Sequence, residues 1–295
     1  MSSQAFADGA HEKALARDAG RAAVDGRVDR FPAIAPLPPD TDAPEHADRS
    51  GERADATAVS LVIPAKNEAR NLAHVLERVP ACVDEILLVD GRSRDATRLM
   101  ARACRPDIRI ISEPARGKGC ALRAGFHAAR GEVIVAMDAD GSMSPEEIPH
   151  LLYFLERGYD FVKGSRFVGG GGSLDITPLR RIGNRGLLAV ANLLYGSRFT
   201  DLCYGFFAFR RRFLEHLALE STGFEIETEL TVRAFLAGLR IAEIPSLELP
   251  RRGGRSSLHS FRDGQRVLRT LIAQRVEARR ARADASGDDP LALPE

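Results

Sequence analysis

The sequence has few cysteines and none in pairs. Its four cysteines, Cys82, Cys104, Cys120 and Cys203, stand singly, with no C-x-x-C spacing. This argues against a zinc knuckle or a redox dithiol and fits a reducing compartment, where disulfides are rare. We therefore expect buried thiols at all four positions.

A long apolar run is also missing. A membrane-spanning helix needs about 20 apolar residues, and the longest candidate stretch extends only from Leu187 to Leu194. Asp8, Glu12 and Asp18 interrupt the short alanine stretches of the N-terminus, which lacks the charged start and apolar centre of a secretory signal. We expect a cytoplasmic protein, working at the inner face of the membrane if its acceptor is a lipid.

Neither sign of charge dominates. The chain has 42 Lys and Arg residues against 41 Asp and Glu, a formal net charge of +1. No global field steers such a chain toward nucleic acid or an anionic surface, so we expect no nucleic-acid partner. Any recognition of anions must be local.

The first 57 residues differ in composition from the rest. They are rich in Ala, Asp, Arg and Pro, poor in Val, Ile and Leu, and contain the run Pro36-Leu37-Pro38-Pro39. Proline cannot occupy a helix interior or a central strand, and a segment with few apolar residues cannot build a core. We predict a disordered leader over residues 1–57, either a solvated tail or a docking segment.

From Val59 onward, short apolar runs alternate with amphipathic segments. Continuous apolar runs are typical of strands buried on both faces, and the segments between them have helical periodicity. This alternation predicts an α/β fold, a mostly parallel sheet with helices on both faces. The expected strands are 59–63, 85–89, 108–111, 132–137 and 161–162, and the expected helices are 68–79, 94–103, 118–129 and 145–157.

Beyond residue 167 the periodicity is looser. The run Gly169 to Gly172 predicts a flexible connector or mobile lid. We expect helices over 178–195, over 225–237 and from 261 into the cluster Arg279-Arg280-Ala281-Arg282, a strand over 204–209 and an extended segment over 240–249.

Polar residues follow the predicted strands directly. Ligands of such sheets bind at the carboxyl ends of the strands, and there the chain reads Pro64-Ala-Lys-Asn67-Glu68, Asp90-Gly-Arg-Ser93, Asp138-Ala-Asp140-Gly141 and Gly164-Ser-Arg166. Two carboxylates two residues apart on a turn suit Mg²⁺ or Mn²⁺ bridging a diphosphate. By itself this D-x-D pattern is weak, because a solvated turn capping the next helix has the same form.

The ordered set of motifs resembles the family 2 glycosyltransferases of the GT-A fold, and most of all the dolichol-phosphate mannosyltransferase and polyprenyl-phosphate glycosyltransferase branch. The resemblance covers about Val59 to Arg275. It rests on the four motifs above and on others further along: Gly117-Lys118-Gly119, Thr200-Asp201-Leu-Cys-Tyr-Gly205, Glu225-Ile-Glu227-Thr-Glu229 and Arg251-Arg252-Gly-Gly-Arg255-Ser256. It implies a nucleotide-binding half over about 58–166, an acceptor half over about 167–275 and a basic, then acidic tail over 276–295.

The resemblance also implies roles for single residues. Glu68 and Asp90 would accept hydrogen bonds from base and ribose, with Pro64, Asn67 and Ala139 beside them. Asp138 would reach ribose or metal, and Asp140 the metal. Lys118, at a helix start, and Arg166 would contact phosphate. Where many relatives read D-D-G-S, this chain reads Asp90-Gly91-Arg92-Ser93, which leaves the base open.

The acceptor determines what the distal residues must do. A hydroxyl acceptor requires a carboxylate as general base. The candidates for this base are Asp201, Glu225 and Glu227. We predict three catalytic residues in all: Asp140, Asp201 and Glu227. A polyprenyl phosphate is already ionised and needs no base. Arg251, Arg252 and Arg255 with Ser256 would then form a cradle for its phosphate, unless these arginines merely solubilise a loop.

The resemblance implies an inverting transfer of a hexose from a nucleoside-diphosphate sugar, GDP-mannose or UDP-glucose, to a polyprenyl phosphate or another envelope precursor. The last helix combines an apolar stripe with many arginines. Such a helix either makes peripheral contact with a membrane or packs on its own domain.

Two other functions stay open. One is a sugar nucleotidyltransferase, although a glycine-rich loop should then follow the first strand. The other is a non-catalytic regulator that binds nucleotide sugars.

Overall fold

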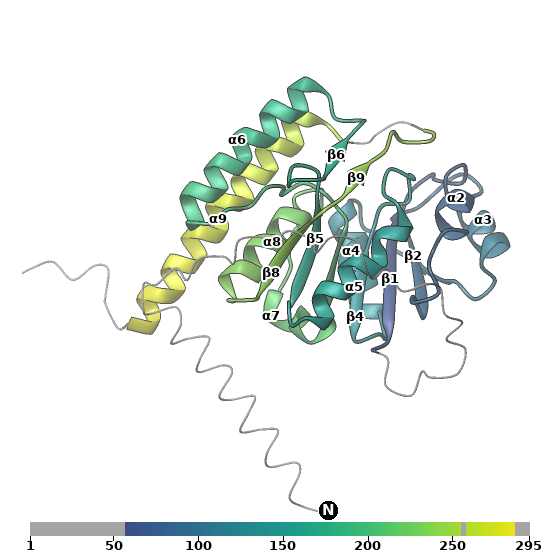
Figure 1. The fold of residues 1–295 in the computed structure, drawn as a ribbon, viewed down its shortest axis with the longest axis horizontal. Coiled ribbons are helices and arrows are strands. Elements are labelled where there is room, and N and C mark those ends of the chain that lie inside the picture. Colours follow the sequence, from purple (N-terminus) through teal and green to yellow (C-terminus); the bar gives the residue numbers. More distant parts are fainter. Residues whose placement is uncertain (1–56, 255–257, 287–295) are drawn as a thin grey trace, which may run out of the picture.

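A computed structural model describes residues 57–254 and 258–286, with side chains described as far as residue 281. Residues 1–56, nearly all of the predicted leader, and residues 287–295, the acidic end of the predicted tail, lie outside the described residues. Figure 1 shows the arrangement of the described part.

One seven-stranded sheet forms the centre, in the order β3-β2-β1-β4-β7-β5-β8. Neighbouring strands run parallel except at β7, which is antiparallel to both β4 and β5. The mostly parallel sheet expected from the apolar runs is therefore present. The strands are β1 (Val59–Ala65), β2 (Glu85–Asp90), β3 (Arg109–Ser112), β4 (Val133–Ala136), β5 (Phe161–Ser165), β7 (Phe207–Arg210) and β8 (Ile241–Pro245).

Helices cover both faces of the sheet, as Figure 1 shows. The flanking helices are α2 (Leu72–Leu76), α3 (Thr97–Cys104), α4 (Lys118–Ala128), α5 (Ile148–Glu156), α6 (Pro178–Tyr195), α7 (Leu214–Leu217), α8 (Ile226–Leu236) and α9 (Ser260–Ser286), with short 3₁₀ turns η1 (Pro145–Glu147) and η2 (Arg211–Phe213).

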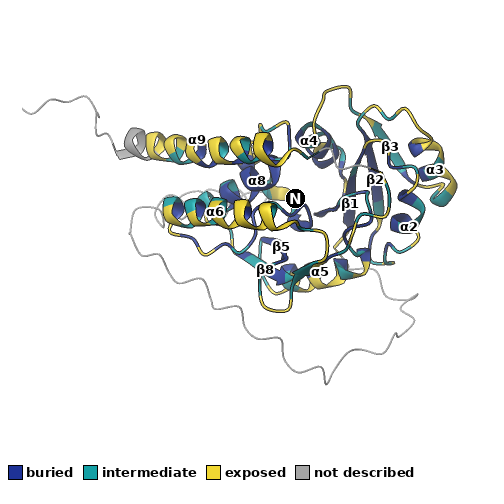
Figure 2. Cartoon of the chain, turned by 90° about the horizontal axis from the view of Figure 1, so that it is seen from above, coloured by how far each residue is buried: buried dark blue, intermediate teal, exposed yellow. Residues whose placement is uncertain are grey.

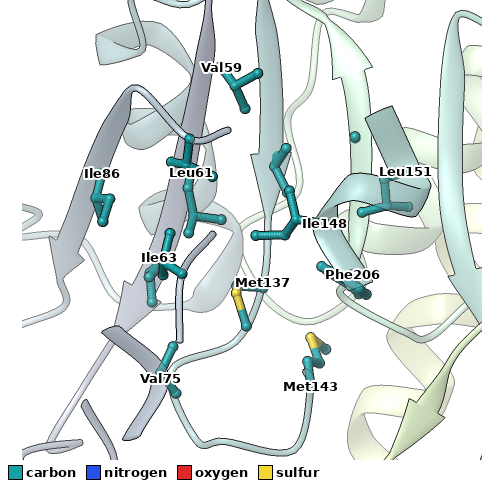
Figure 3. Close-up of a cluster of buried hydrophobic side chains, with 14 of the residues drawn as sticks. Val59, Leu61, Ile63, Val75, Ile86, Met137, Met143, Ile148, Leu151 and Phe206 are labelled. Atoms are coloured by element: carbon teal, nitrogen blue, oxygen red, sulfur yellow. The ribbon is translucent and has the colours of Figure 1, made fainter. Parts of the chain in front are cut away.

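The sheet separates two apolar cores, because successive side chains of a strand point to opposite faces. Leu61 and Ile63 of β1 pack with α2 and α5 in one core, part of which Figure 3 shows. Val62, between them, packs with α4, α8 and α9 in the other. None of the four cysteines, all of which are in the described part of the chain, forms a disulfide, and each is only partly buried, so the expectation of buried thiols was wrong.

Helix α2 is shorter than the predicted 68–79. Its first turn is replaced by a loop whose backbone is bound to the start of α3 and the residues just before it. The Glu68 amide donates to Thr97 Oγ1 at 2.9 Å and the Ala69 amide to an Asp95 carboxylate oxygen at 3.2 Å. These long-range bonds compete with helical ones, and apolar spacing does not reveal them.

The glycine run is part of a second, small sheet. β6 (Gly172–Ser173) pairs in parallel with β9 (Leu247–Glu248), and the Gly172 amide donates to the Ser246 carbonyl at 3.1 Å. A Cβ on Gly171 would lie 2.3 Å from the Ser165 carbonyl oxygen. The glycines thus permit a close backbone approach, and the last of them is paired in a strand; the predicted flexible connector or mobile lid stays a prediction.

Helices α6 and α9 lie side by side and project beyond the sheet (Figures 1 and 2). The Tyr195 hydroxyl donates to the Leu271 carbonyl at 2.5 Å and ties them together. Helix α9 continues to Ser286, across the boundary predicted at residue 275. Among the described residues, no helix combines the length and apolar character needed to cross a bilayer.

Candidate active site

The loops after β1 and β2 form one edge of the site. Ala65 pairs with Asp90 where the two strands end. The Asn67 amide donates to Ser93 Oγ at 2.9 Å, and Asn67 Oδ1 accepts from the Arg94 amide at 2.8 Å. Asn67 has φ +58°, a conformation that asparagine tolerates better than most residues. These bonds fix the backbone that carries Glu68 and Asp90.

The turn after β4 carries the D-x-D pair. Asp140 Oδ1 accepts from the Ser142 amide at 3.0 Å and from the Ser142 hydroxyl at 2.7 Å. Gly141 has φ +76° and allows the chain to turn sharply between them. Ala139 is buried, and the carboxylates on either side of it keep part of their surface exposed.

Lys118 joins the D-x-D turn to a distal carboxylate. Its Nζ lies 2.5 Å from Asp138 Oδ1 and 2.5 Å from Glu227 Oε1. Lys118 is the first residue of α4, and Glu227 belongs to the first turn of α8. A Cβ on Gly205 would come within 2.6 Å of both Lys118 Nζ and Glu227 Oε1, so a larger residue there would displace the ends of these two side chains.

Arg251 makes the matching bridge on the other side. Its guanidinium lies 3.0 Å from Glu68 Oε1 through Nη1 and 3.0 Å from Asp140 Oδ2 through Nη2. Its loop is held against the site, because the Leu249 amide donates to the Ser142 carbonyl at 2.8 Å and the Arg252 amide to the Asp140 carbonyl at 3.3 Å. The Asn71 Nδ2 group donates to Glu68 Oε2 at 2.5 Å and to the Gly253 carbonyl at 3.3 Å.

The protonation of these groups reflects crowding of like charge. Burial, together with the negative charges of Asp140 and Glu227, raises the pKa of Asp138 to about 6 against the pull of Lys118. Burial also raises the pKa of Glu68, opposed by Asn71 and Arg251. Burial alone would lower the pKa of Lys118, but the two carboxylates beside it raise it, so the ammonium stays charged. The site is an acidic cluster held together by two internal cations.

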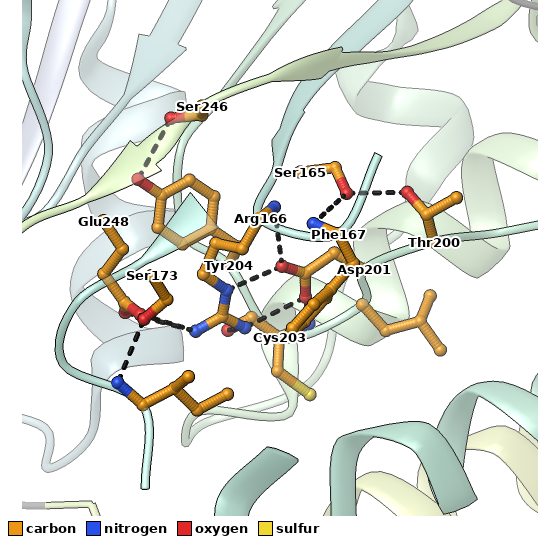
Figure 4. A network of polar contacts seen from close by, with 12 residues as sticks. Ser165, Arg166, Phe167, Ser173, Thr200, Asp201, Cys203, Tyr204, Ser246 and Glu248 are labelled. Carbon is orange, nitrogen blue, oxygen red and sulfur yellow. Dashed lines mark hydrogen bonds and ion pairs between the residues drawn. The ribbon is translucent and has the colours of Figure 1, made fainter. Parts of the chain in front are cut away.

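Two predicted residues belong to a different cluster, shown in Figure 4. Arg166 donates through Nε to Asp201 Oδ2 at 2.7 Å and through Nη2 to Asp201 Oδ1 at 3.0 Å. Its Nη1 binds Glu248 at 3.1 Å. Asp201 is fully buried. Both oxygens of Asp201 accept from a permanent cation, an arrangement that disfavours the role of general base. The catalytic role of Asp201 and the phosphate contact of Arg166 stay predictions.

The remaining predicted residues lie as follows. Pro64 is in β1. Arg252 lies beside the D-x-D turn, with its Nη1 3.4 Å from His74 Nε2. Glu225, one of the three candidate bases, is buried, and its Oε1 accepts from the Gly223 amide at 2.9 Å. Ser256 lies outside the described residues.

Sequence reasoning missed two contributors, Asn71 and the bridging role of Arg251. Asn71 is buried, and its Oδ1 has no partner among the described residues. Its one available signal was its place three residues after Glu68. Arg251 gave none, because 183 residues separate it from Glu68.

The donor set fits a divalent cation in part. Among the described residues, no three His, Cys, Asp or Glu side chains are arranged to hold a metal by themselves. Mg²⁺, however, is usually held by one or two carboxylates, with water and substrate phosphates completing its shell. Asp138 and Asp140 offer such a pair, and the two cations that now neutralise the cluster show that it favours positive charge.

Known proteins resemble this chain in sequence or in fold. Residues 60–218, just over half of the chain, match the family described as Glycosyl transferase family 2. An undecaprenyl-phosphate mannosyltransferase of Micrococcus luteus is 34% identical over 239 residues, which cover 76% of this chain and 98% of that protein. A polyprenol monophosphomannose synthase of Mycolicibacterium smegmatis is 35% identical over 63% of this chain and 75% of its own length.

A solved glucosyl-3-phosphoglycerate synthase of Mycobacterium tuberculosis, in complex with Mn²⁺, UDP and glucosyl-3-phosphoglycerate, matches with a TM-score of 0.60. It is 24% identical, and the match covers 74% of this chain and 80% of that one, a likeness that concerns the fold. The predicted GT-A architecture is thereby confirmed. The chain belongs to glycosyltransferase family 2.

Proposed function

We propose that this protein transfers a hexose, with inversion, from a nucleoside-diphosphate sugar to a polyprenyl phosphate. The observation that carries the proposal is the cluster of Glu68, Asp138, Asp140 and Glu227 around two cationic side chains at the carboxyl edge of the sheet. The family supplies the reaction class, and the M. luteus and M. smegmatis relatives supply the acceptor class by their names.

On the donor side, Glu68 and Asp90 would accept hydrogen bonds from base and ribose, because their loops are fixed and both carboxylates lie at the strand ends. Asp138 and Asp140 would hold Mg²⁺ or Mn²⁺. When bound, such an ion neutralises charge on the departing nucleoside diphosphate. Lys118 holds Asp138 and Glu227 in place and adds positive charge beside the phosphates. GDP-mannose and UDP-glucose are the two donors proposed.

On the acceptor side, the contacts of the distal carboxylates favour an acceptor that arrives ionised. Asp201 is bound to Arg166, and Glu227 is bound to Lys118. A hydroxyl acceptor would need one of the distal carboxylates as general base. A phosphate needs none, and the loop with Arg251 and Arg252 lies beside the D-x-D turn, where it would bind the anion.

The paired helices offer a place for contact with the membrane in which a polyprenyl phosphate resides. Exposed residues cover much of the outer surface of α6 and α9 (Figure 2). The exposed apolar residues are Phe261, Ile272 and Val276 of α9 and Leu179, Ile182 and Leu193 of α6. Exposed arginines, including Arg262, Arg269 and Arg279, accompany the apolar residues of α9. An amphipathic helix of this kind binds an anionic bilayer surface. We propose peripheral contact at the cytoplasmic face.

The test is a donor and acceptor screen. The purified protein is incubated with Mn²⁺, with UDP-glucose or GDP-mannose, and with polyprenyl phosphate or 3-phosphoglycerate, and products are identified by mass spectrometry. We expect a glycosylated polyprenyl phosphate and free nucleoside diphosphate. Transfer only to 3-phosphoglycerate would contradict the acceptor. Nucleotide-sugar binding without release of diphosphate across the panel would instead support a non-catalytic regulator. The nucleotidyltransferase alternative is set aside by the family.

A further inference from the structure

The cluster of carboxylates holds more negative charge than its two internal cations neutralise. Glu68 interacts with Asp140, and Asp138 with both Asp140 and Glu227. Four carboxylates against Lys118 and Arg251 leave a formal charge of −2, which is the charge that one divalent ion balances. Carboxylates crowded in this way repel one another unless a cation lies between them.

The two cations differ in how firmly they are held. Lys118 is on a helix and is nearly buried, with 10% of its side chain exposed. Arg251 is on a loop, 23% of its side chain is exposed, and it lies against Glu68 and Asp140, the residues proposed to bind nucleotide and metal. Its guanidinium can leave without moving the backbone, because that backbone is held separately through Leu249 and Arg252.

We infer that Arg251 exchanges partners during the reaction cycle. Without nucleotide it neutralises Glu68 and Asp140; when a divalent ion and nucleotide take these carboxylates, the guanidinium is released and binds the phosphate of the acceptor. The inference rests on the proposed function and adds to it the exchange of partners by Arg251 and an order of binding, donor before acceptor.

The exchange follows from the chemistry of arginine. A guanidinium stays protonated in proteins, so an Arg251 displaced from two carboxylates is available to another anion, and its planar fork fits phosphate oxygens as well as it fits carboxylates. The metal and Arg251 compete for Asp140, so the apparent affinity for metal and nucleotide is reduced by the fraction of molecules in which Arg251 is bound there.

The test is a pair of binding titrations on the full chain, by calorimetry, for wild type and Arg251→Ala. One uses Mn²⁺ with UDP or GDP, and the other uses farnesyl monophosphate in the presence of saturating Mn²⁺ and nucleotide. We expect the variant to bind Mn²⁺ and nucleotide about tenfold more tightly and farnesyl monophosphate about tenfold more weakly. If Arg251 exchanges partners, the two affinities change in opposite directions in the variant. If Arg251 only stabilises the site, the variant binds both Mn²⁺ with nucleotide and farnesyl monophosphate more weakly.

Two further variants refine the test. Arg251→Lys keeps the charge but cannot bridge both carboxylates with a planar fork, so we expect a smaller gain in Mn²⁺ affinity and partial retention of phosphate binding. Arg70→Ala, an exposed arginine next to Gly253, removes the same charge beside the same loop and should shift neither affinity.

The outcomes separate the inference from the proposed function. If wild type binds Mn²⁺ with UDP or GDP but Arg251→Ala binds them no more tightly, the exchange is wrong and the proposed function stands. If Arg251→Ala binds farnesyl monophosphate as tightly as wild type, Arg251 does not bind the acceptor phosphate, and that part of the inference is wrong. If wild type binds neither nucleotide with Mn²⁺, the proposed function itself fails.

Discussion

Two clusters in this molecule pair arginine with two carboxylates, and they differ in their access to solvent. Arg166 is bound to Asp201 and Glu248 in the interior, with 4% of its side chain exposed (Figure 4). Arg251 is bound to Glu68 and Asp140 with 23% of its side chain exposed. A buried charge cannot lose its partner without a large desolvation cost, whereas a partly exposed one can be exchanged. The same residue types therefore stabilise the fold in one place and form a replaceable contact in the other.

The largest expected effect tests the permanence of the buried cluster. Arg166→Ala leaves Asp201 buried without its cation, and we expect the free energy of unfolding to fall by about 3 to 5 kcal/mol. Arg251→Ala should lower it by about 1 kcal/mol or less, since exposed ion pairs contribute little. Urea denaturation of both variants measures the difference. Equal losses would show that the two clusters do not differ in the way described.

The second effect concerns activity and the partly exposed cluster, in which Arg251 is bound to Glu68 and Asp140. Asp140→Asn keeps an acceptor for the Ser142 amide but removes the charge that a divalent ion needs. We expect turnover with Mn²⁺ to fall about 100-fold or more, because such an ion contributes several kcal/mol to stabilising the departing charge. The unfolding midpoint, measured alongside, should stay close to that of wild type. Full activity in this variant would remove the metal role of Asp140.

A third, smaller effect bears on the acceptor. Glu227→Gln takes one carboxylate from Lys118 without adding bulk. If the acceptor is an ionised phosphate, we expect a loss in kcat of only about tenfold, below the range of 100-fold to 10,000-fold that general-base catalysis supplies. A steady-state pH profile of wild type and variant checks this. A loss of 100-fold or more, together with disappearance of the acid limb of the profile, would point to a hydroxyl acceptor.

The smallest effect concerns the N-terminal region. Each described partner of the exposed cluster follows Val59 in the chain: Asn71, Lys118 and Arg251 are examples. Deleting residues 1–56 should therefore leave kcat and the KM for the donor nearly unchanged. A large rise in the donor KM would show that this region takes part in the site.

Much of the fold could be predicted because its signals are local. The apolar run of β1 and its β-branched residues predicted a buried strand, and the residues after β4 marked the D-x-D turn before any contact was known. Chain order alone did not indicate that β7 inserts antiparallel between β4 and β5, since the apolar character of Phe207–Arg210 fits either direction.

Some residues of the site could be predicted and others could not, because the sequence shows local signals and does not show contacts between distant residues. Glu68, Asp138 and Asp140 directly follow strands, so their meeting at one edge follows from strand direction. Asp201 and Glu227 are both carboxylates of the distal half, and nothing local distinguishes them. Only packing revealed that Asp201 is enclosed with Arg166 while Glu227 faces Lys118.

By itself, the sequence determined the alternation of strands and helices, the family, and the acidic residues at the ends of the strands, because apolar periodicity and short motifs act over a few residues. The tertiary structure alone decided which cation neutralises which carboxylate. Arg251 is 183 residues from Glu68, and Lys118 is 109 residues from Glu227. Burial decides whether each such pair is permanent, and burial depends on the whole fold.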